Sequence, residues 1–213
     1  MSTKVSGTKE RILEAAEALF SERGFAGTSV RAVTAVAGTN LNAINYHFGS
    51  KEELFRAVVR RIMGPVNEEQ LQLLDELETG KALGEAPSVE ELIGAYISPL
   101  ADLLERDEER GLVVSRLVAR ILADAGGSFQ RVALAEVEET EARYLRAFAR
   151  ALPHLPEEEL WWRFQTTAVV IAFHRVTLLS GSRPPKTYPE MEKGVRTWMT
   201  AYLAAALSAP AAR

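Results

Sequence analysis

The sequence predicts an all-α protein, in which a small N-terminal domain of three short helices precedes a larger helical bundle. Apolar residues recur at helical spacing along most of the 213 residues, and no segment shows the sustained alternation typical of β-strands. Gly and Pro fall mostly between these patterns, where they end helices. Hydrophobic residues make up 47% of the chain, which is enough to bury an ordinary globular core.

The three short helices are expected within the first 50 residues. Apolar stripes over residues 12–20, 30–37 and 41–48 predict them in turn. Their ends follow from glycines that stop helices and from polar residues that cap them, namely Gly24, Thr28, Ser29, Gly38, Asn40 and Gly49. A Gly-containing turn of about four residues joins the second helix to the third, which is the spacing of a helix-turn-helix unit.

The helices expected after residue 50 are longer. Two residue pairs have the form of capping boxes that open helices, and two prolines are expected to break or kink helices: Ser50 with Glu53, Ser88 with Glu91, Pro65 and Pro99. Helices are then predicted at about 66–79, 88–106, 109–125, 128–152, 157–180 and 189–208. With no sheet to cover, these helices must pack on one another. We expect a helix-turn-helix domain at residues 1–50 and a second helical domain at residues 51–213.

The composition excludes several kinds of site and compartment. The chain has no cysteine, which excludes disulfides, thiolate metal sites and cysteine nucleophiles. The longest apolar run spans seven residues (201–207), far fewer than the roughly 18 that a membrane helix needs. The first 20 residues lack the apolar block of a signal peptide. We therefore expect a cytoplasmic protein with no membrane partner.

The charges are distributed unevenly along the chain. Residues 1–63 hold nine Lys or Arg against six Asp or Glu, whereas the remaining residues hold 16 against 23. The formal net charge of −4 is therefore the sum of a basic N-terminal part, residues 1–63, and an acidic remainder, residues 64–213. This asymmetry indicates that only the N-terminal part meets a polyanion.

No motif points to catalysis. The three histidines are far apart, and none has the spacing of a metal ligand. The sequence also lacks a nucleophile-elbow pattern, a glycine-rich phosphate loop and a dinucleotide-binding fingerprint. We expect no enzymatic activity, cofactor or metal, and an enzyme with a site assembled from scattered residues ranks third among the alternatives.

The most informative motif lies between residues 24 and 54. It reads GFAGTSVR at 24–31, AG at 37–38 and NLNAINYHFGSKEEL at 40–54. These residues resemble the DNA-binding head of the TetR family of bacterial transcriptional regulators, whose recognition helix ends Tyr-His-Phe-x-Ser-Lys-Glu-x-Leu. The likeness covers about residues 8–55. It implies a homodimeric, ligand-responsive regulator that binds a double-stranded DNA operator and represses transcription.

The recognition helix departs from the family pattern at a few positions. Thr39 replaces the Val that usually follows Ala-Gly, Leu41 and Asn42 stand where small or basic residues are usual, and Asn45 replaces an aromatic residue. Such positions usually face the bases in this family. The departures therefore imply an altered operator and an intact head.

The spacing within this helix predicts which side chains face DNA. Asn42 and Asn45 are three residues apart on one face, while Ile44 and Phe48 would pack inward. Asparagine donates and accepts hydrogen bonds together, which suits the adenine edge in the major groove. Leu41 could belong to the core or touch a thymine methyl group. Together with side chains expected at phosphates, the predicted DNA-binding residues are Thr28, Ser29, Asn40, Leu41, Asn42, Asn45, Tyr46, His47 and Lys51.

The last two predicted helices are expected to form the four-helix interface of a homodimer. They are long, they end the chain, and they carry the expected interface residues Leu160, Trp161, Phe164, Val195, Trp198 and Tyr202. Aromatic residues at helical spacing are also typical of a core, so Trp161 and Phe164 fit either position. Two recognition helices related by a twofold axis would read a near-palindromic operator.

The second domain is also expected to enclose an elongated, mostly apolar pocket for a small-molecule effector. It has more long amphipathic helices than a dimer stalk requires, and prolines leave gaps in helix packing. The candidate lining is Leu74, Tyr96, Leu100, Leu117, Ile121 and Phe148. The recognition helix resembles that of a TetR subgroup associated with fatty-acid and acyl-type effectors, which implies a fatty acid or acyl-CoA ligand. The alternative is a helix-turn-helix DNA-binding protein that has no small-molecule effector and acts through protein partners.

Overall fold

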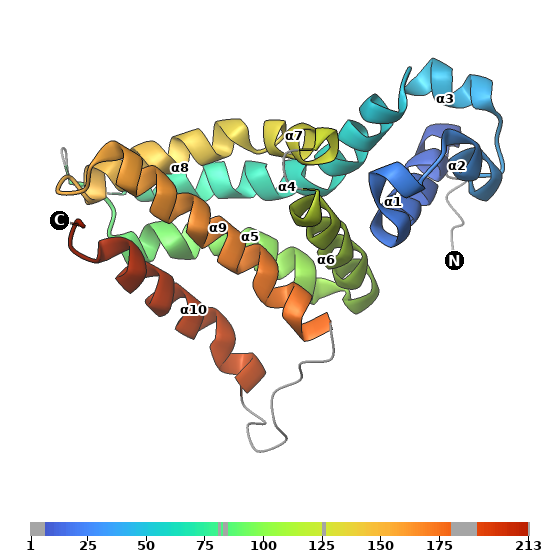
Figure 1. The fold of residues 1–213 in the computed structure, drawn as a ribbon. Coiled ribbons are helices and arrows are strands. Elements are labelled where there is room, and N and C mark those ends of the chain that lie inside the picture. The colour runs from blue at the N-terminus through green and yellow to red at the C-terminus, as the bar shows by residue number, and fades with distance from the viewer. Residues whose placement is uncertain (1–6, 81, 83–84, 125–126, 180–190, 213) are drawn as a thin grey trace. The chain divides into compact units, whose positions relative to one another are not determined.

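The computed structural model describes residues 7–80, 82, 85–124, 127–179 and 191–212. These ranges contain ten helices and no strand (Figure 1), which confirms the predicted all-α fold. Gly126 and the loop predicted at 180–189 lie outside the described residues. In chain order the helices are α1 (Thr8–Gly27), α2 (Val30–Val36), α3 (Leu41–His47), α4 (Lys51–Thr79), α5 (Val89–Arg106), α6 (Glu108–Ala123), α7 (Ser128–Ala135), α8 (Glu138–Ala151), α9 (Glu157–Leu179) and α10 (Met191–Ser208).

The helices form two compact units, each assembled from two stretches of the chain. The first unit comprises residues 1–65 and 109–137, and the second comprises residues 66–108 and 138–213. The first unit therefore contains α1 to α3, the start of α4, most of α6 and all of α7. These units group residues by contact, so the functional division expected at residue 50 stays a prediction.

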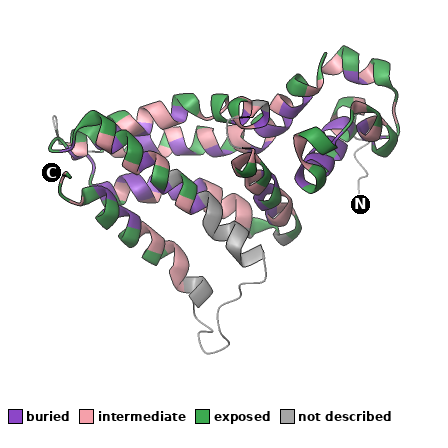
Figure 2. Ribbon diagram, viewed as in Figure 1, coloured by how far each residue is buried: buried purple, intermediate pink, exposed green. Residues whose placement is uncertain are grey.

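The first unit is built around α1, which contacts both α2 and α3. Its core contains the fully buried side chains of Ile12, Val33, Ile44 and Leu54, and Figure 2 shows these inward faces in purple. An aromatic cluster extends this core from the head to α7, and it consists of Phe20, Phe25, Phe55 and Phe129. The apolar stripes predicted from the sequence thus form the core of the three short helices.

The helix α4 continues through Pro65, so it does not break there, and the kink expected as the alternative stays a prediction. Ile62 and Val66, one turn apart on either side of the proline, are both buried, and one apolar stripe therefore runs past it. Burial of that stripe outweighs the single main-chain hydrogen bond that a proline removes. The helix α5 likewise continues through Pro99, although an interruption was expected.

The two predicted capping boxes have different outcomes. Ser88 accepts from the backbone N–H of Glu91, whose carboxylate accepts in return from the Ser88 N–H at 2.7 Å, so this box is confirmed. Ser50 accepts from the N–H of Glu53 at 3.1 Å, but its own N–H donates to Phe48 O at 2.9 Å. Because that N–H donates to a carbonyl, Ser50 caps α4 without the reciprocal half of a box.

The single helix predicted at 128–152 is in fact two helices, α7 and α8. Residues 136 and 137 form tight turns, in which their N–H groups donate to carbonyls three residues earlier, both at 3.1 Å. The carboxylate of Glu136 accepts from Arg60 Nε at 2.9 Å and lies 3.5 Å from Arg56 Nε. No Gly or Pro marks this break in the sequence, so it follows from tertiary contacts with α4.

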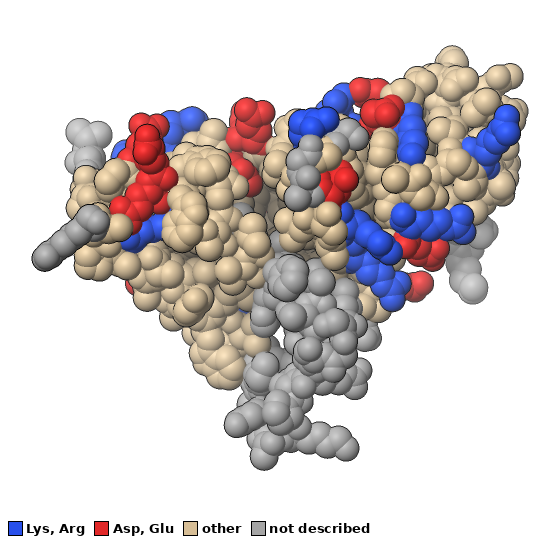
Figure 3. All heavy atoms as spheres, in the orientation of Figure 1, with Lys and Arg blue, Asp and Glu red and all other residues tan. Residues whose placement is uncertain are grey.

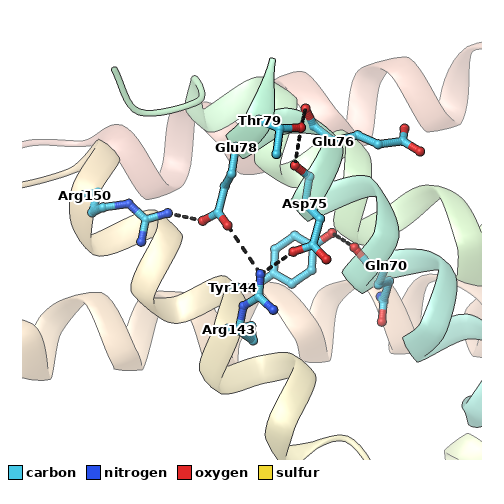
Figure 4. A network of polar contacts seen from close by, with 8 residues as sticks. All are labelled: Gln70, Asp75, Glu76, Glu78, Thr79, Arg143, Tyr144 and Arg150. Atoms are coloured by element: carbon cyan, nitrogen blue, oxygen red, sulfur yellow. Dashed lines mark hydrogen bonds and ion pairs between the residues drawn. The ribbon is translucent and has the colours of Figure 1, made fainter. Parts of the chain in front are cut away.

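The second unit is held together by an apolar core and by polar contacts among α4, α5 and α8. The Tyr144 hydroxyl donates to Gln70 O at 2.8 Å, and Gln70 Nε2 donates to Tyr96 O at 2.6 Å. Figure 4 shows Tyr144 pointing at α4, beside Arg143, which pairs with Asp75 at 2.5 Å. Burial raises the pKa of Tyr96 and Tyr144, so both stay neutral at ordinary pH.

One arginine fastens the end of α10 to α9. The guanidinium of Arg163 donates to the carbonyl oxygens of Leu207 at 2.9 Å, Ala209 at 2.6 Å and Pro210 at 2.8 Å. These carbonyls lie in the last turn of α10 or just after it, where carbonyls lack intrahelical donors. No helix among the described residues is long and apolar enough to cross a membrane.

Candidate DNA-binding interface

The turn between α2 and α3 has a fixed geometry. Gly38 has a φ of 59°, the left-handed region that residues other than glycine rarely adopt. The N–H of Thr39 then donates to Thr34 O at 3.0 Å, which satisfies a free carbonyl at the end of α2. Asn40 starts α3 as its cap, because its Oδ1 accepts from the N–H of Ala43 at 3.0 Å. These local contacts set the angle at which α3 leaves α2.

Thr28 has a structural role, which corrects its prediction as a phosphate contact. Its side chain is 1% exposed, and its hydroxyl donates to Leu19 O at 3.0 Å and Gly24 O at 2.8 Å. Gly24 has a φ of 71° inside α1, so the regular helix stops there and leaves carbonyls for Thr28 to bind. Ser29 is the residue that caps α2, and it is exposed.

The face of α3 that was predicted to read bases is exposed. Asn42 and Asn45 lie on the surface, Tyr46 is 85% exposed and Leu41 is 45% exposed (Figure 2). Ile44 is fully buried and fixes the opposite face of the helix. Leu41 therefore does not belong to the core, which leaves contact with a thymine methyl group as its predicted role.

The cap residue and the following polar residues are placed differently. Asn40 is exposed, but its Oδ1 is used to cap α3, so only its amide N–H groups are left to meet DNA. His47 is half-buried, with its ring 5.0 Å from that of Tyr46. Lys51 opens α4, and its Nζ lies 4.1 Å from the centroid of the Phe25 ring. In the sequence, Phe25 was noted only as part of the motif, and its contact with Lys51 was not predicted.

Much of the basic charge of the first unit is neutralised within it. Arg56 and Arg60 pair with Glu136, and Arg61 pairs with Glu10 at 2.7 Å. The hydrogen bond and charge of Glu136 raise the pKa of Arg60. Figure 3 accordingly shows Lys and Arg atoms lying beside Asp and Glu atoms. The Arg61–Glu10 pair joins two residues that are already balanced in the excess of three along residues 1–63, whereas Glu136 lies outside that count.

The predicted dimer residues divide into buried and exposed sets. Leu160 and Phe164 are covered by the protomer's own core, so a partner cannot reach their side chains and we withdraw them from the predicted interface. Trp161, Trp198 and Tyr202 are more than half exposed, and Val195 is half-buried. Trp162 is also exposed, although it was not among the predicted interface residues.

The predicted pocket residues do not share one core. Leu74 and Phe148 are fully buried in the core of the second unit, and Tyr96 and Leu100 pack against that core. Two further candidates, Leu117 and Ile121, belong to the first unit, and their place in a pocket stays a prediction. The sequence offered no signal for this division, because both are apolar residues on one amphipathic helix.

Two family models match the chain. Residues 12–58 match the model described as "Bacterial regulatory proteins, tetR family". Residues 94–206 match the model described as "Tetracyclin repressor-like, C-terminal domain". The first match covers the helices of the head with the start of α4, and the second covers most of the remaining helices.

Curated relatives match mainly over the N-terminal part. The transcriptional repressor NicS of Pseudomonas putida is 38% identical over 79 residues, which are 37% of each chain. The transcriptional regulator RutR of Escherichia coli is 42% identical over 62 residues, or 29% of each chain. The dual regulator CecR of Shigella flexneri is 31% identical over 122 residues, or 56% of this chain and 53% of CecR. The chain thus spans about half or less of the length of these relatives.

Solved structures share the fold over nearly the whole chain. A protein described as a TetR-family transcriptional regulator from Rhodococcus superposes with a TM-score of 0.61 at 16% identity, covering 94% of this chain and 98% of that one. A transcriptional regulator from Aquifex aeolicus gives 0.55 at 22% identity, again over 94% and 98%.

Proposed function

Because the chain belongs to the TetR family of bacterial transcriptional regulators, we propose that it represses transcription by binding a near-palindromic operator as a homodimer. Membership makes it a DNA-binding regulator and not an enzyme. The observation that carries the proposal is the exposed face of α3, where Leu41, Asn42, Asn45 and Tyr46 point to solvent while Ile44 anchors the helix. The names of relatives such as NicS support repression as the direction of control.

Base reading is assigned to the exposed α3 face, and phosphate binding to its borders. Asn42 and Asn45 offer paired donors and acceptors to adenine, and Leu41 offers an apolar contact to thymine. Ser29, Asn40, Tyr46, His47 and Lys51 flank this face and would bind phosphates, which fixes the register of the helix on the duplex.

In a homodimer, the partner protomer would supply a second α3 helix to contact DNA bases. One seven-residue recognition helix contacts only a few base pairs, which is too few to select one site in a genome. The exposed aromatic side chains Trp161, Trp198 and Tyr202 on α9 and α10 support an interface there, because isolated protomers rarely expose several large aromatic residues together. A twofold axis would space the two α3 helices for half-sites about 34–36 Å apart, or a multiple of that.

An apolar or acyl-type effector would release the repressor from DNA. Four of the expected lining residues, Leu74, Tyr96, Leu100 and Phe148, belong to or pack against one apolar cluster of the second unit, and the ligand is expected to bind beside this cluster. The effector can act only by binding two arrangements of the dimer with different affinity. A coupling typical of such pairs, about 1–3 kcal/mol, would lower operator affinity by about 5–150-fold.

Selection of bound duplexes from a random DNA pool tests the proposal. The expected product is a near-palindrome with two half-sites, each showing an adenine preference, and sedimentation of the free protein should give a dimer. Selected DNA without a palindrome, together with a monomer at micromolar concentration, would contradict it. Titration of the selected operator with long-chain fatty acids and their CoA thioesters then tests the effector. If none weakens operator binding, a regulator that acts through protein partners is favoured.

A further inference from the structure

Lys51, which is expected to contact a DNA phosphate, lies against the aromatic cluster of Phe20, Phe25, Phe55 and Phe129. The distance of 4.1 Å from Lys51 Nζ to the Phe25 ring centroid is well within the roughly 6 Å over which a ring face attracts an ammonium group. Partial burial lowers the pKa of Lys51, which fits an ammonium group that has lost part of its water shell. The ring therefore holds the cationic end of a side chain that would otherwise move freely.

Phe25 is itself held by the other three rings of the cluster. The Phe20 ring stacks on it with centroids 5.9 Å apart, and the Phe55 ring meets it edge-on at 5.8 Å. The Phe129 ring, from α7, lies 5.7 Å from Phe25 and 4.1 Å from Phe55. Phe129 is buried, so α7 supplies a fixed support behind the Phe25 ring.

This support matters for DNA because a lysine side chain is long and flexible. Binding a phosphate normally restricts its rotamers, and that restriction opposes binding. A ring that already holds the ammonium group removes part of this cost before DNA arrives. The ring face occupies one side of the group, whose three N–H donors leave others free for a phosphate oxygen.

We propose that Phe25 is a positioning residue for DNA binding, which holds the Lys51 ammonium group ready for a phosphate, and that Phe129 fixes Phe25. The inference rests on the proposed function, because it takes Lys51 to contact the DNA backbone. It assigns part of the sequence-independent affinity to α7, a helix outside the helix-turn-helix unit.

A double-mutant cycle on the full chain tests this coupling. The probe is a short mixed-sequence duplex, whose binding is measured by fluorescence anisotropy at several salt concentrations. Lys51→Met and Phe25→Leu are each expected to weaken binding by about three- to tenfold, and Lys51→Met should lower the salt slope by about one unit per phosphate contact removed. The double variant should bind no more weakly than Lys51→Met alone. Phe25→Tyr keeps the ring and should bind as the wild type does.

Two further variants separate positioning from loss of stability. Phe129→Leu should weaken binding less than Phe25→Leu, and its effect should vanish in the Lys51→Met background. Leu92→Ala removes a fully buried side chain of the second unit and should leave binding to this duplex unchanged. All variants are compared at a temperature where circular dichroism shows each of them folded.

The outcomes distinguish the inference from the proposed function. If Lys51→Met binds as the wild type does, Lys51 is not a phosphate contact and that part of the proposed function fails. If Lys51→Met weakens binding but the Phe25→Leu loss persists undiminished in its background, only the positioning role is wrong. Tighter binding by Phe25→Leu would also overturn the inference, because the ring would then compete with the phosphate.

Discussion

Polar residues of the helix-turn-helix unit perform two separate tasks. The Thr28 hydroxyl and the Asn40 Oδ1 satisfy backbone groups at helix ends, whereas the exposed side chains of Asn42 and Asn45 are left wholly for DNA. Residue type alone does not separate these tasks, because Thr and Asn suit both caps and phosphates. Position relative to a helix end decides which task a side chain can perform.

Asn45→Ala tests the base-reading assignment. The substitution is expected to cost about 1–3 kcal/mol on the selected operator and to relax the preference at one position of each half-site. Binding to a mixed-sequence duplex should change little, since Asn45 is not assigned to a phosphate. Anisotropy on both duplexes measures the difference. An equal loss on the two duplexes would show that the reading face of α3 is wrongly assigned.

Thr28→Val tests the structural role of the buried hydroxyl. Valine has a similar shape but cannot donate, so the carbonyls of Leu19 and Gly24 lose their partner, at a cost of about 1–3 kcal/mol. Urea unfolding should show this loss, while DNA affinity of the folded protein stays within about twofold. A large loss of DNA affinity at unchanged stability would instead restore Thr28 as a phosphate contact.

Most elements defined by local contacts could be predicted from the sequence, although the box expected at Ser50 and Glu53 forms only in half, whereas those defined by tertiary contacts could not. The box of Ser88 and Glu91 needs only two residues three apart, and it is present as predicted. The break after α7 depends on Glu136 reaching Arg60 on α4, 76 positions earlier, so no short pattern encodes it. Continuity of α4 through Pro65 similarly depends on burial along the whole helix. In the site, the α3 face was predictable from spacing, but the Phe25–Lys51 contact was not.

Arg163→Met tests how α10 is fastened to α9. Methionine retains the apolar stem but removes the guanidinium donors to the carbonyls at the end of α10 and just after it, and the expected cost is about 1–3 kcal/mol. Amide hydrogen exchange near residues 207–212 should quicken more than elsewhere in α10. Arg146→Met is the control, because Arg146 is an exposed arginine of α8. Equal effects of the two substitutions would refute the fastening role.

Glu141→Gln tests whether burial of the Glu141 carboxylate on α8 lowers the stability of the folded protein. Burial raises the pKa of Glu141, so the folded state keeps this proton to higher pH than the unfolded chain does. Stability is therefore lost as pH rises from the unfolded pKa through the folded one, and the loss is complete above the folded pKa. Glutamine still accepts from Gln165, so the variant should melt higher than the wild type at pH 7.5, with a smaller difference at pH 4.

Glu139→Gln is the matched control for this measurement. It removes an exposed carboxylate from the same first turn of α8, and it therefore reports the interaction of an anion with the helix N-terminus alone. That interaction favours the charged form, so Glu139→Gln should leave the melting temperature unchanged or slightly lower. A Glu141→Gln protein that melts lower than the wild type at pH 7.5 would disprove the role of burial.

At the scale of the whole molecule, we propose that assembly into a dimer sets the affinity for the operator. Trp198→Glu combined with Tyr202→Glu places charges on side chains that are 57% and 66% exposed, so the protomer should still fold. Sedimentation should show a shift to monomer, and operator affinity should fall more than tenfold because one half-site is lost. Leu134→Glu, an exposed apolar residue of the first unit, is the control. A dimer that survives the double substitution would move the interface elsewhere.

The interleaving of the two units limits how this regulator can be recombined with its relatives. Residues 109–137 return to the first unit, where Arg120 donates to Glu22 O at 2.9 Å and Phe129 packs on Phe25 and Phe55. A hybrid that exchanges only residues 1–50 would place a foreign head against the α6 and α7 side chains that contact the native one. We therefore expect operator specificity to transfer between relatives only when residues 109–137 are exchanged together with residues 1–65.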